Sequence, residues 1–157
     1  MKSVILTKYG APEVLKVKEF KDIEPLNNQA RIKVHYAGIN FAEIMARMKL
    51  YPGGPKPGSV LGGEVSGIID KIDKNVKGLS IGDKVMGLTL NGSYSSQACI
   101  DADSIIPLPD NFKLDEAAAF PVTLKGLKST SIRWVSVPPE NILNPLFFKV
   151  SDKILAL

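Results

Sequence analysis

Two polar side chains of this 157-residue chain, Asn40 and Tyr51, are of types that could act on a small molecule. They flank a segment with helical periodicity, and a loop rich in proline and glycine follows Tyr51. A neutral amide and a phenol hydroxyl both donate hydrogen bonds, so either could stabilise negative charge that develops on an oxygen atom. Each also has a structural interpretation, because Asn40 could cap the following helix and Tyr51 could anchor the loop.

Residues that usually bind metal ions or act as nucleophiles are scarce. Cys99 is the only cysteine and His35 the only histidine, so the chain can form neither an intrachain disulfide nor a thiolate metal cluster. Both lie in strand-like sequence; we expect Cys99 to be a small buried hydrophobic residue and His35 to be structural. Glu64 is expected to be a buried carboxylate that supports the preceding loop, where Gly62 and Gly63 allow close backbone approach or a positive φ.

The elements that must position these side chains are mostly short strands separated by turn residues. Strands are predicted at residues 4–8, 14–20, 30–36, 64–72, 94–100 and 104–109, with residues 76–85 forming a turn that leads into another strand. Helices are predicted at residues 41–49 and 114–120. The first shows apolar residues at spacings of three and four, namely Phe41, Ile44, Met45 and Met48. Many short strands with few helices favour a mainly β fold, a small closed or partly closed barrel.

Five sequence blocks occur in the order and spacing of a known family. They are GINFAEIMARMKLYP, PGSVLGGEVSGII, GLSIGDKVMGL, GSYSSQACI and LDEAAAFPVT. Together they resemble the catalytic domain of zinc-free medium-chain dehydrogenase/reductases, especially the quinone oxidoreductases and the synaptic-vesicle membrane proteins of the vesicle amine transport group. The resemblance covers residues 1–123 and implies a GroES-like, partly closed β-barrel, in agreement with the strand pattern.

The resemblance implies roles for three residues. At the positions of Asn40 and Tyr51 the family presents side chains to the nicotinamide and the substrate carbonyl, so we expect both to be catalytic and Asn40 also to bind cofactor. Thr123 would lie near the nicotinamide, although it could equally be a simple helix-start residue. The implied reaction is hydride transfer from NADPH to a quinone or an α,β-unsaturated carbonyl. Met45 replaces a tyrosine often found on this helix, which weakens the inference about a particular substrate.

Zinc is not expected. In zinc-dependent relatives a cysteine stands at the position of Asn40 and a histidine at that of Gly63. An amide is a poor zinc ligand and glycine has no side chain, so Glu64 remains alone, and one carboxylate does not make a site.

The nucleotide-binding half of such an enzyme has no counterpart in the sequence. A Rossmann domain needs a strand, a G-x-G-x-x-G turn and a helix. This pattern is absent among the 13 glycines, the last of which is Gly126. We therefore expect residues 124–157 to be a divergent tail, with 150–157 resembling the first strand of the missing domain. A truncated, frameshifted or alternatively spliced product would give this pattern, and so would a naturally short paralogue. NADPH, though implied by the family, is not expected to bind this chain tightly.

Two functions remain open at this stage. One is the catalytic-domain portion of an NADPH-dependent quinone or enone oxidoreductase, inactive by itself and able to take its substrate only if the missing domain is supplied. The other is a non-enzymatic barrel that binds a partner or forms a homodimer through an uncovered apolar face.

Composition and charge limit the expected binding partners and cellular location. The net charge of +4 comes mostly from the tail, and residues 1–123 show no basic face with interleaved aromatic residues, so nucleic-acid binding is not expected. No apolar run reaches the ~18 residues of a membrane span, and the N-terminus lacks the features of a signal peptide. The single cysteine fits a cytoplasmic location.

Overall fold

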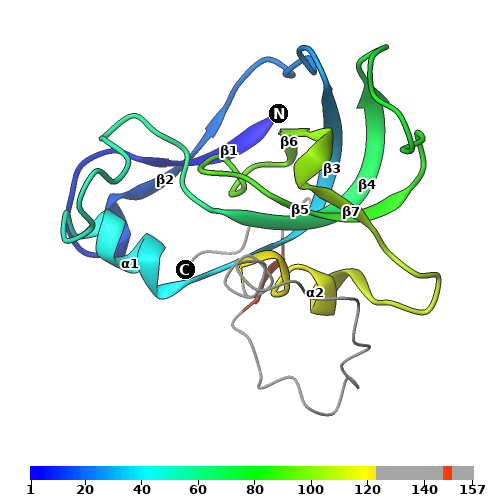
Figure 1. The fold of residues 1–157 in the computed structure, drawn as a ribbon. Coiled ribbons are helices and arrows are strands. Elements are labelled where there is room, and N and C mark those ends of the chain that lie inside the picture. The colour runs from blue at the N-terminus through cyan, green and yellow to red at the C-terminus, as the bar shows by residue number, and fades with distance from the viewer. Residues whose placement is uncertain (123–146, 150–157) are drawn as a thin grey trace.

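The computed structural model describes residues 1–122 and 147–149, and its centre is a curled half-barrel (Figure 1). Five strands form this sheet in the order β6-β3-β4-β5-β7, and a short sixth strand, β8, pairs with β3. Their bounds are β3 (Gln29–Gly38), β4 (Glu64–Ile72), β5 (Lys84–Leu88), β6 (Gln97–Asp101), β7 (Ile105–Pro107) and β8 (Phe147–Lys149). The predicted mainly β, GroES-like architecture is confirmed for this part of the chain.

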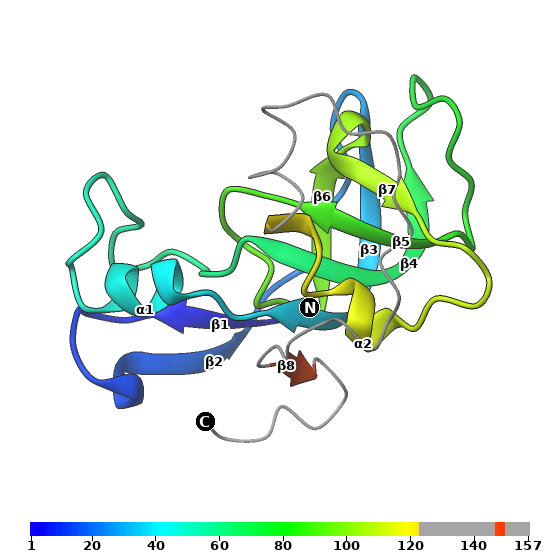
Figure 2. The ribbon, with the colours of Figure 1, turned by 60° about the horizontal axis from the view of Figure 1, so that its bottom comes forward.

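The long strands β3 and β4 organise the sheet. They pair antiparallel from Ala30↔Ile72 to Ala37↔Val65. Antiparallel pairing brings the end of β3 beside the start of β4, although these points are far apart in sequence. On its other edge, β3 pairs first with β6 and then, at residues 36–38, with β8 (Figure 2). The register shifts between Val34 and Tyr36, which makes His35 the extra residue of a β-bulge, a structural role.

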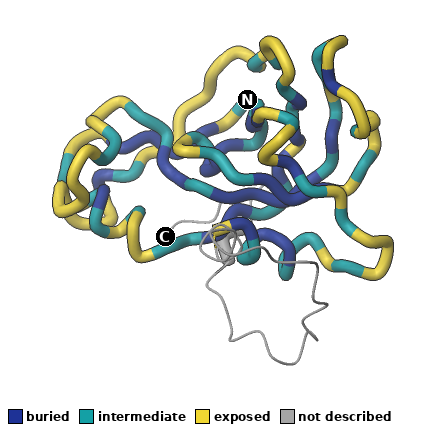
Figure 3. Tube along the Cα trace, viewed as in Figure 1, coloured by how far each residue is buried: buried dark blue, intermediate teal, exposed yellow. Residues whose placement is uncertain are grey.

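The core is formed mainly by residues of the strands. Side chains alternate along β3, where Ile32 is fully buried and Lys33 is exposed. The core residues include Val4, Leu6, Ile32, Val34, Leu61, Val65, Ile69, Val85 and Ile100. Burial is therefore concentrated in the strands, as the dark blue segments of Figure 3 show.

A two-stranded sheet lies beside the half-barrel. It consists of β1 (Lys2–Leu6) and β2 (Leu15–Glu19), joined through a short 3₁₀ helix, η1 (Pro12–Val14). Four of the five residues of β1 are buried, but β2 is largely exposed, with Val17 at 49%. The prediction of a half-buried strand at 14–20 was therefore wrong in burial. A strand at the edge of a two-stranded sheet has no layer to cover it, and charged residues keep that edge soluble.

Two short helices complete the described part of the chain. Helix α2 (Leu114–Ala117) packs against β3, β4 and β5, and Ser66 of β4 donates a hydrogen bond to the carbonyl of Leu114. A second 3₁₀ helix, η2 (Ala102–Ser104), links β6 to β7. Helix α1 (Phe41–Arg47) begins at the predicted residue but stands to one side of the barrel (Figure 1).

The apolar stripe of α1 does not face the core. Phe41 is 72% exposed and Met48 49% exposed, while Ala46 is the buried residue of the helix. The helix is held at its end by Arg47, which donates a hydrogen bond to the carbonyl of Gly10, and by the Lys49 ammonium 5.5 Å from the centre of the Tyr9 ring. Its apolar side is therefore available to something outside the described residues.

Among the described residues, no helix combines the length and the apolar character that crossing a membrane requires.

Candidate functional site

The site is built where β3 ends and β4 begins. Asn40 follows β3 as the N-cap of α1, and Glu64 is the first residue of β4, only 2% exposed. The side-chain nitrogen of Asn40 donates a hydrogen bond to Glu64 Oε1 at 2.8 Å. The backbone N–H of Val122 donates to the other oxygen, Oε2, also at 2.8 Å. One buried carboxylate thus joins the start of α1 to the segment after α2.

A second carboxylate holds the backbone of the same asparagine. Glu43 lies on the first turn of α1, and its Oε2 accepts a hydrogen bond from the Asn40 N–H at 2.7 Å. This is the reciprocal contact of a capping box, in which the third helical residue reaches back to the cap. Asn40 is therefore fixed through both its main chain and its side chain, and it occupies the predicted N-cap position.

Burial raises the pKa of both carboxyl groups. For Glu64, burial is the largest cause of the raised pKa; hydrogen bonds from Val122 and Asn40 oppose it, and the nearby charge of Glu43 adds to it. For Glu43, burial again raises the pKa, against hydrogen bonds from backbone N–H groups that include those of Asn40 and Gly63. The two groups are therefore weaker acids than exposed glutamates, and the proximity of their charges makes simultaneous ionisation less favourable.

A tyrosine that sequence reasoning overlooked lies near this pair. Burial, reinforced by the charges of Glu43 and Glu64, holds the pKa of Tyr94 far above its ordinary value, so Tyr94 remains a neutral phenol.

Two glycines make room for the arrangement. A Cβ atom at Gly38 would overlap Glu64 Oε1 and lie 2.7 Å from the carbonyl oxygen of Ala118. Gly62 has φ of +97°, and a Cβ there would overlap the Ser93 hydroxyl. The predicted close approach and positive φ are confirmed for Gly62. Gly38 was not identified from the sequence as a position of close approach. Its place two residues before a helix cap could have indicated one.

The expected role of Glu64 needs correction. We predicted support for the loop containing Gly62 and Gly63, but the groups that donate hydrogen bonds to the Glu64 carboxylate are the Asn40 side chain and the Val122 N–H. The reason is the β3–β4 register, which places the first residue of β4 beside the turn that carries Asn40.

Tyr51 lies in a different environment. It is 49% exposed and occupies a turn closed by a hydrogen bond from the Gly54 N–H to its carbonyl. The turn follows α1, so Asn40 and Tyr51 stand at opposite ends of the helix. Thr123, the third predicted site residue, lies outside the described residues.

Within residues 1–122 and 147–149, no three histidine, cysteine, aspartate or glutamate side chains gather closely enough to hold a metal ion. At the position where zinc-dependent relatives carry histidine, a Cβ on Gly63 would lie 3.3 Å from Glu43 Oε1. The absence of bound zinc stays a prediction.

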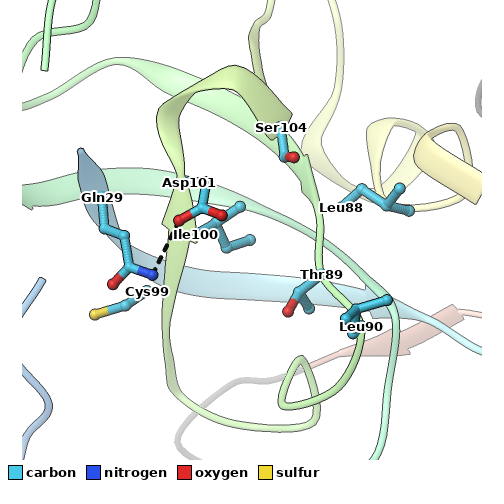
Figure 4. Close-up of a pocket in the computed structure, with 8 residues that line it drawn as sticks. All are labelled: Gln29, Leu88, Thr89, Leu90, Cys99, Ile100, Asp101 and Ser104. Carbon is cyan, nitrogen blue, oxygen red and sulfur yellow. Dashed lines mark hydrogen bonds between the residues drawn. The ribbon is translucent and has the colours of Figure 1, made fainter. Parts of the chain in front are cut away.

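A shallow hollow of about 230 Å³ lies elsewhere, between the ends of β3, β5 and β6 (Figure 4). None of the predicted site residues lines it. Its wall includes Cys99, which is only half-buried, so the prediction of a buried cysteine was wrong. Partial burial still raises the pKa of the Cys99 thiol to about 11, which keeps it protonated and unreactive at neutral pH. Gln29 donates a hydrogen bond to Asp101 across the wall at 3.0 Å.

Comparison with known proteins gives a consistent set of relatives. Residues 26–110 match the model of the alcohol dehydrogenase GroES-like domain. The chain is 32% identical over 122 residues to the mouse (Mus musculus) synaptic vesicle membrane protein VAT-1 homolog-like and 39% identical over 121 residues to Escherichia coli quinone oxidoreductase 1. The crystal structure of Escherichia coli quinone oxidoreductase complexed with NADPH superposes with a TM-score of 0.71 at 35% identity, over 75% of this chain and 36% of that one.

The matches are partial in length. The two sequence alignments cover 78% and 76% of this chain, but only 29% of the mouse protein and 36% of the Escherichia coli protein. The chain thus spans about a third of the length of these relatives.

Proposed function

This chain belongs to the alcohol dehydrogenase GroES-like domain family of the medium-chain dehydrogenase/reductases, and from that premise we propose that it is the catalytic-domain portion of an NADPH-dependent quinone or enone oxidoreductase. Its substrate would be a quinone or an α,β-unsaturated carbonyl, and the chain would be inactive until a nucleotide-binding domain is supplied. A cytoplasmic location, without zinc, is part of the proposal.

The observation that carries the proposal is the held amide of Asn40. An asparagine nitrogen has two N–H groups, and Glu64 accepts a hydrogen bond from this nitrogen. The remaining N–H can donate to a substrate or nicotinamide oxygen without first having to be ordered. A donor fixed in advance stabilises developing negative charge more effectively than a mobile one.

The residues of this chain suit only one end of the cofactor. NADPH, when bound, supplies the hydride, and Asn40 would contact its nicotinamide end. The phosphates need backbone N–H groups at a glycine turn and a helix N-terminus, and no G-x-G-x-x-G turn occurs in the sequence. We therefore expect the chain to bind NADPH weakly, with a dissociation constant above about 1 μM in calorimetric titration.

A chimera tests the proposal most directly. Residues 1–122 would replace the corresponding part of Escherichia coli quinone oxidoreductase, and NADPH-dependent reduction of a quinone would be measured. We expect turnover, and we expect Asn40→Ala to lower kcat/KM about 100-fold, as the loss of one fixed donor does in other enzymes. Asn27→Ala, which removes an exposed amide in a turn, is the control and should leave kcat/KM unchanged. A folded chimera that reduces no quinone would contradict the proposal.

A second candidate function is a non-enzymatic barrel that binds a partner or a second copy of itself. The exposed apolar side of α1 and the turn after it favour this candidate, because Phe41 is 72%, Leu50 58% and Tyr51 49% exposed. Sedimentation of the full chain separates the two candidates. A dimer that Phe41→Ser converts to monomer supports the second, whereas a monomer at all concentrations removes its homodimeric form.

A further inference from the structure

We propose that Glu64 is the positioning residue of this site: its ionised carboxylate sets which end of the Asn40 amide faces outward and ties that amide to the backbone at Val122. The effect of Glu64 on catalysis rests on the proposed function. Its contacts with Asn40 and Val122 can be measured without catalysis.

The first argument is the use of both carboxylate oxygens. Oε1 receives the Asn40 side chain and Oε2 receives the Val122 N–H, each at 2.8 Å. The donors come from segments 24 and 58 residues away in the sequence. With Glu64 only 2% exposed, water does not substitute readily for either donor. The two segments are therefore held relative to each other through this single side chain.

The second argument is the polarity of the contact. An ionised carboxylate only accepts hydrogen bonds, so it selects the NH₂ end of the Asn40 amide and leaves the carbonyl oxygen on the far side. A protonated or amidated group at position 64 could instead donate to that oxygen and stabilise the reversed amide. The protonation state of Glu64 thus decides the orientation of the Asn40 amide. An ionised Glu64 binds the NH₂ group, whereas a protonated Glu64 can bind the amide oxygen instead.

The third argument is that the end of β3 lacks a side chain where Glu64 reaches Asn40. A Cβ at Gly38 would overlap Glu64 Oε1, so the end of β3 must lack a side chain for Glu64 to reach Asn40. Glu43 approaches the same residue but accepts from its backbone N–H. The two glutamates therefore have separable effects on Asn40, one on its side chain and the other on its main chain.

Glu43 on α1 is the titratable group whose charge raises the pKa of Glu64, and both glutamates raise the pKa of Tyr94 after β5. Tyr94 stays neutral at acid pH, so pH-dependent changes of the site in that range come from the two glutamates. Burial raises the pKa of Glu64, so its titration falls above the range of exposed glutamates.

The test is ¹H–¹⁵N NMR of the full chain, with the Asn40 NH₂ signals assigned from their loss in Asn40→Asp. In the unmodified protein we expect these signals to exchange slowly with water and to move as Glu64 titrates. In Glu64→Gln we expect exchange to become at least about tenfold faster, consistent with the loss of a charge-assisted hydrogen bond, and the pH-dependent movement to disappear.

The matched control is Glu43→Gln. It should alter the backbone N–H signal of Asn40 and its titration, while the NH₂ signals remain slow to exchange. Should Glu64→Gln fail to fold, Glu64→Asp keeps the charge on a shorter arm and should give intermediate exchange with the titration retained. The proposal would be overturned if a folded Glu64 variant showed the same exchange rate and the same titration of the Asn40 NH₂ signals as the unmodified chain.

Failure of this inference and failure of the proposed function are distinguishable. The NMR measurement reads the orientation of Asn40 whether or not the protein turns over a quinone. In the quinone-reducing chimera, Glu64→Gln should lower kcat more than it raises KM, because an incorrectly oriented donor weakens transition-state stabilisation rather than binding.

Discussion

The two residues chosen from the sequence lie in two very different regions. Asn40 belongs to the β3–β4 junction, where buried Glu64 and half-buried Glu43 bind its side chain and its main chain. Tyr51 belongs to the loop after α1, a region of exposed apolar residues in which Gly53 and Gly58 have open space where a side chain would stand. The first region is organised by this chain itself. The second is more exposed, and Tyr51 is held there by a backbone turn.

The largest expected difference comes from two leucines on either side of the 52–58 loop. Leu61 is 1% exposed and Leu50 is 58% exposed. We expect Leu61→Ala to lower the free energy of unfolding by about 3 kcal/mol, since it leaves a cavity, and Leu50→Ala to change it by less than about 0.5 kcal/mol. Urea denaturation of both variants measures the difference. Equal losses would mean that the loop region is as tightly packed as the junction.

Two glycines with positive φ provide the next comparison. At Gly62 a Cβ would overlap Ser93, whereas at Gly53, with φ of +68°, it would meet nothing within 4 Å. Gly62→Ala should cost about 2–3 kcal/mol from strain and overlap together, and Gly53→Ala about 1 kcal/mol from strain alone. Thermal unfolding followed by circular dichroism would show it. The reverse ranking would contradict the close packing at Gly62.

The third comparison concerns pH. The pKa of Glu64 is raised in the folded chain, mainly by burial, so the folded state holds this proton more tightly than the unfolded state. Its stabilising effect is complete at pH values below the ordinary glutamate pKa and is lost as the pH rises toward the raised value. The free energy of unfolding should therefore fall across that window, by at most about 1.4 kcal/mol per pH unit for one group.

Glu64→Gln isolates this effect from the other titrating groups. The unfolding free energy of the unmodified chain minus that of the variant should decrease as the pH rises through the window. A difference that is constant with pH would show that Glu64 does not titrate there.

The smallest expected effect is that of Tyr51→Phe. Because the side chain is 49% exposed, removal of its hydroxyl should change the free energy of unfolding by less than about 0.5 kcal/mol. In the quinone-reducing chimera the same change should lower kcat/KM about tenfold, less than Asn40→Ala, since the exposed phenol is a less firmly positioned hydrogen-bond donor. A loss larger than that of Asn40→Ala would reverse the ranking of the two regions.

Local sequence patterns predicted several elements closely. The strand at 64–72 has the bounds that were predicted, and α1 begins at Phe41 directly after its predicted cap. Such features depend on neighbours within a few residues, namely alternation, turn residues and a capping side chain. Periodicity also identified which residues of α1 share a face. It carries no information about what that face touches, and in the structure Phe41 and Met48 are exposed.

The site depended on contacts that local patterns do not contain. Asn40 was chosen from a family resemblance, yet its link to Glu64 arises from the β3–β4 register, and Val122 joins the same carboxylate from a distance of 58 residues. The pairing of β8 with β3 at residues 36–38 was likewise not anticipated. The predicted boundary at residue 123 and the homodimer stay predictions.

The sequence by itself determined the family, the alternation of short strands and turns, and the residue types at the site. It did so because blocks of residue types at fixed spacing, and local backbone preferences, are properties of neighbouring residues. Only the tertiary structure decided that Glu64 serves Asn40, that Gly38 leaves room for it, and that α1 shows its apolar side outward. These depend on which distant segments pack together, and a buried charge takes its partners from whatever the fold brings within reach.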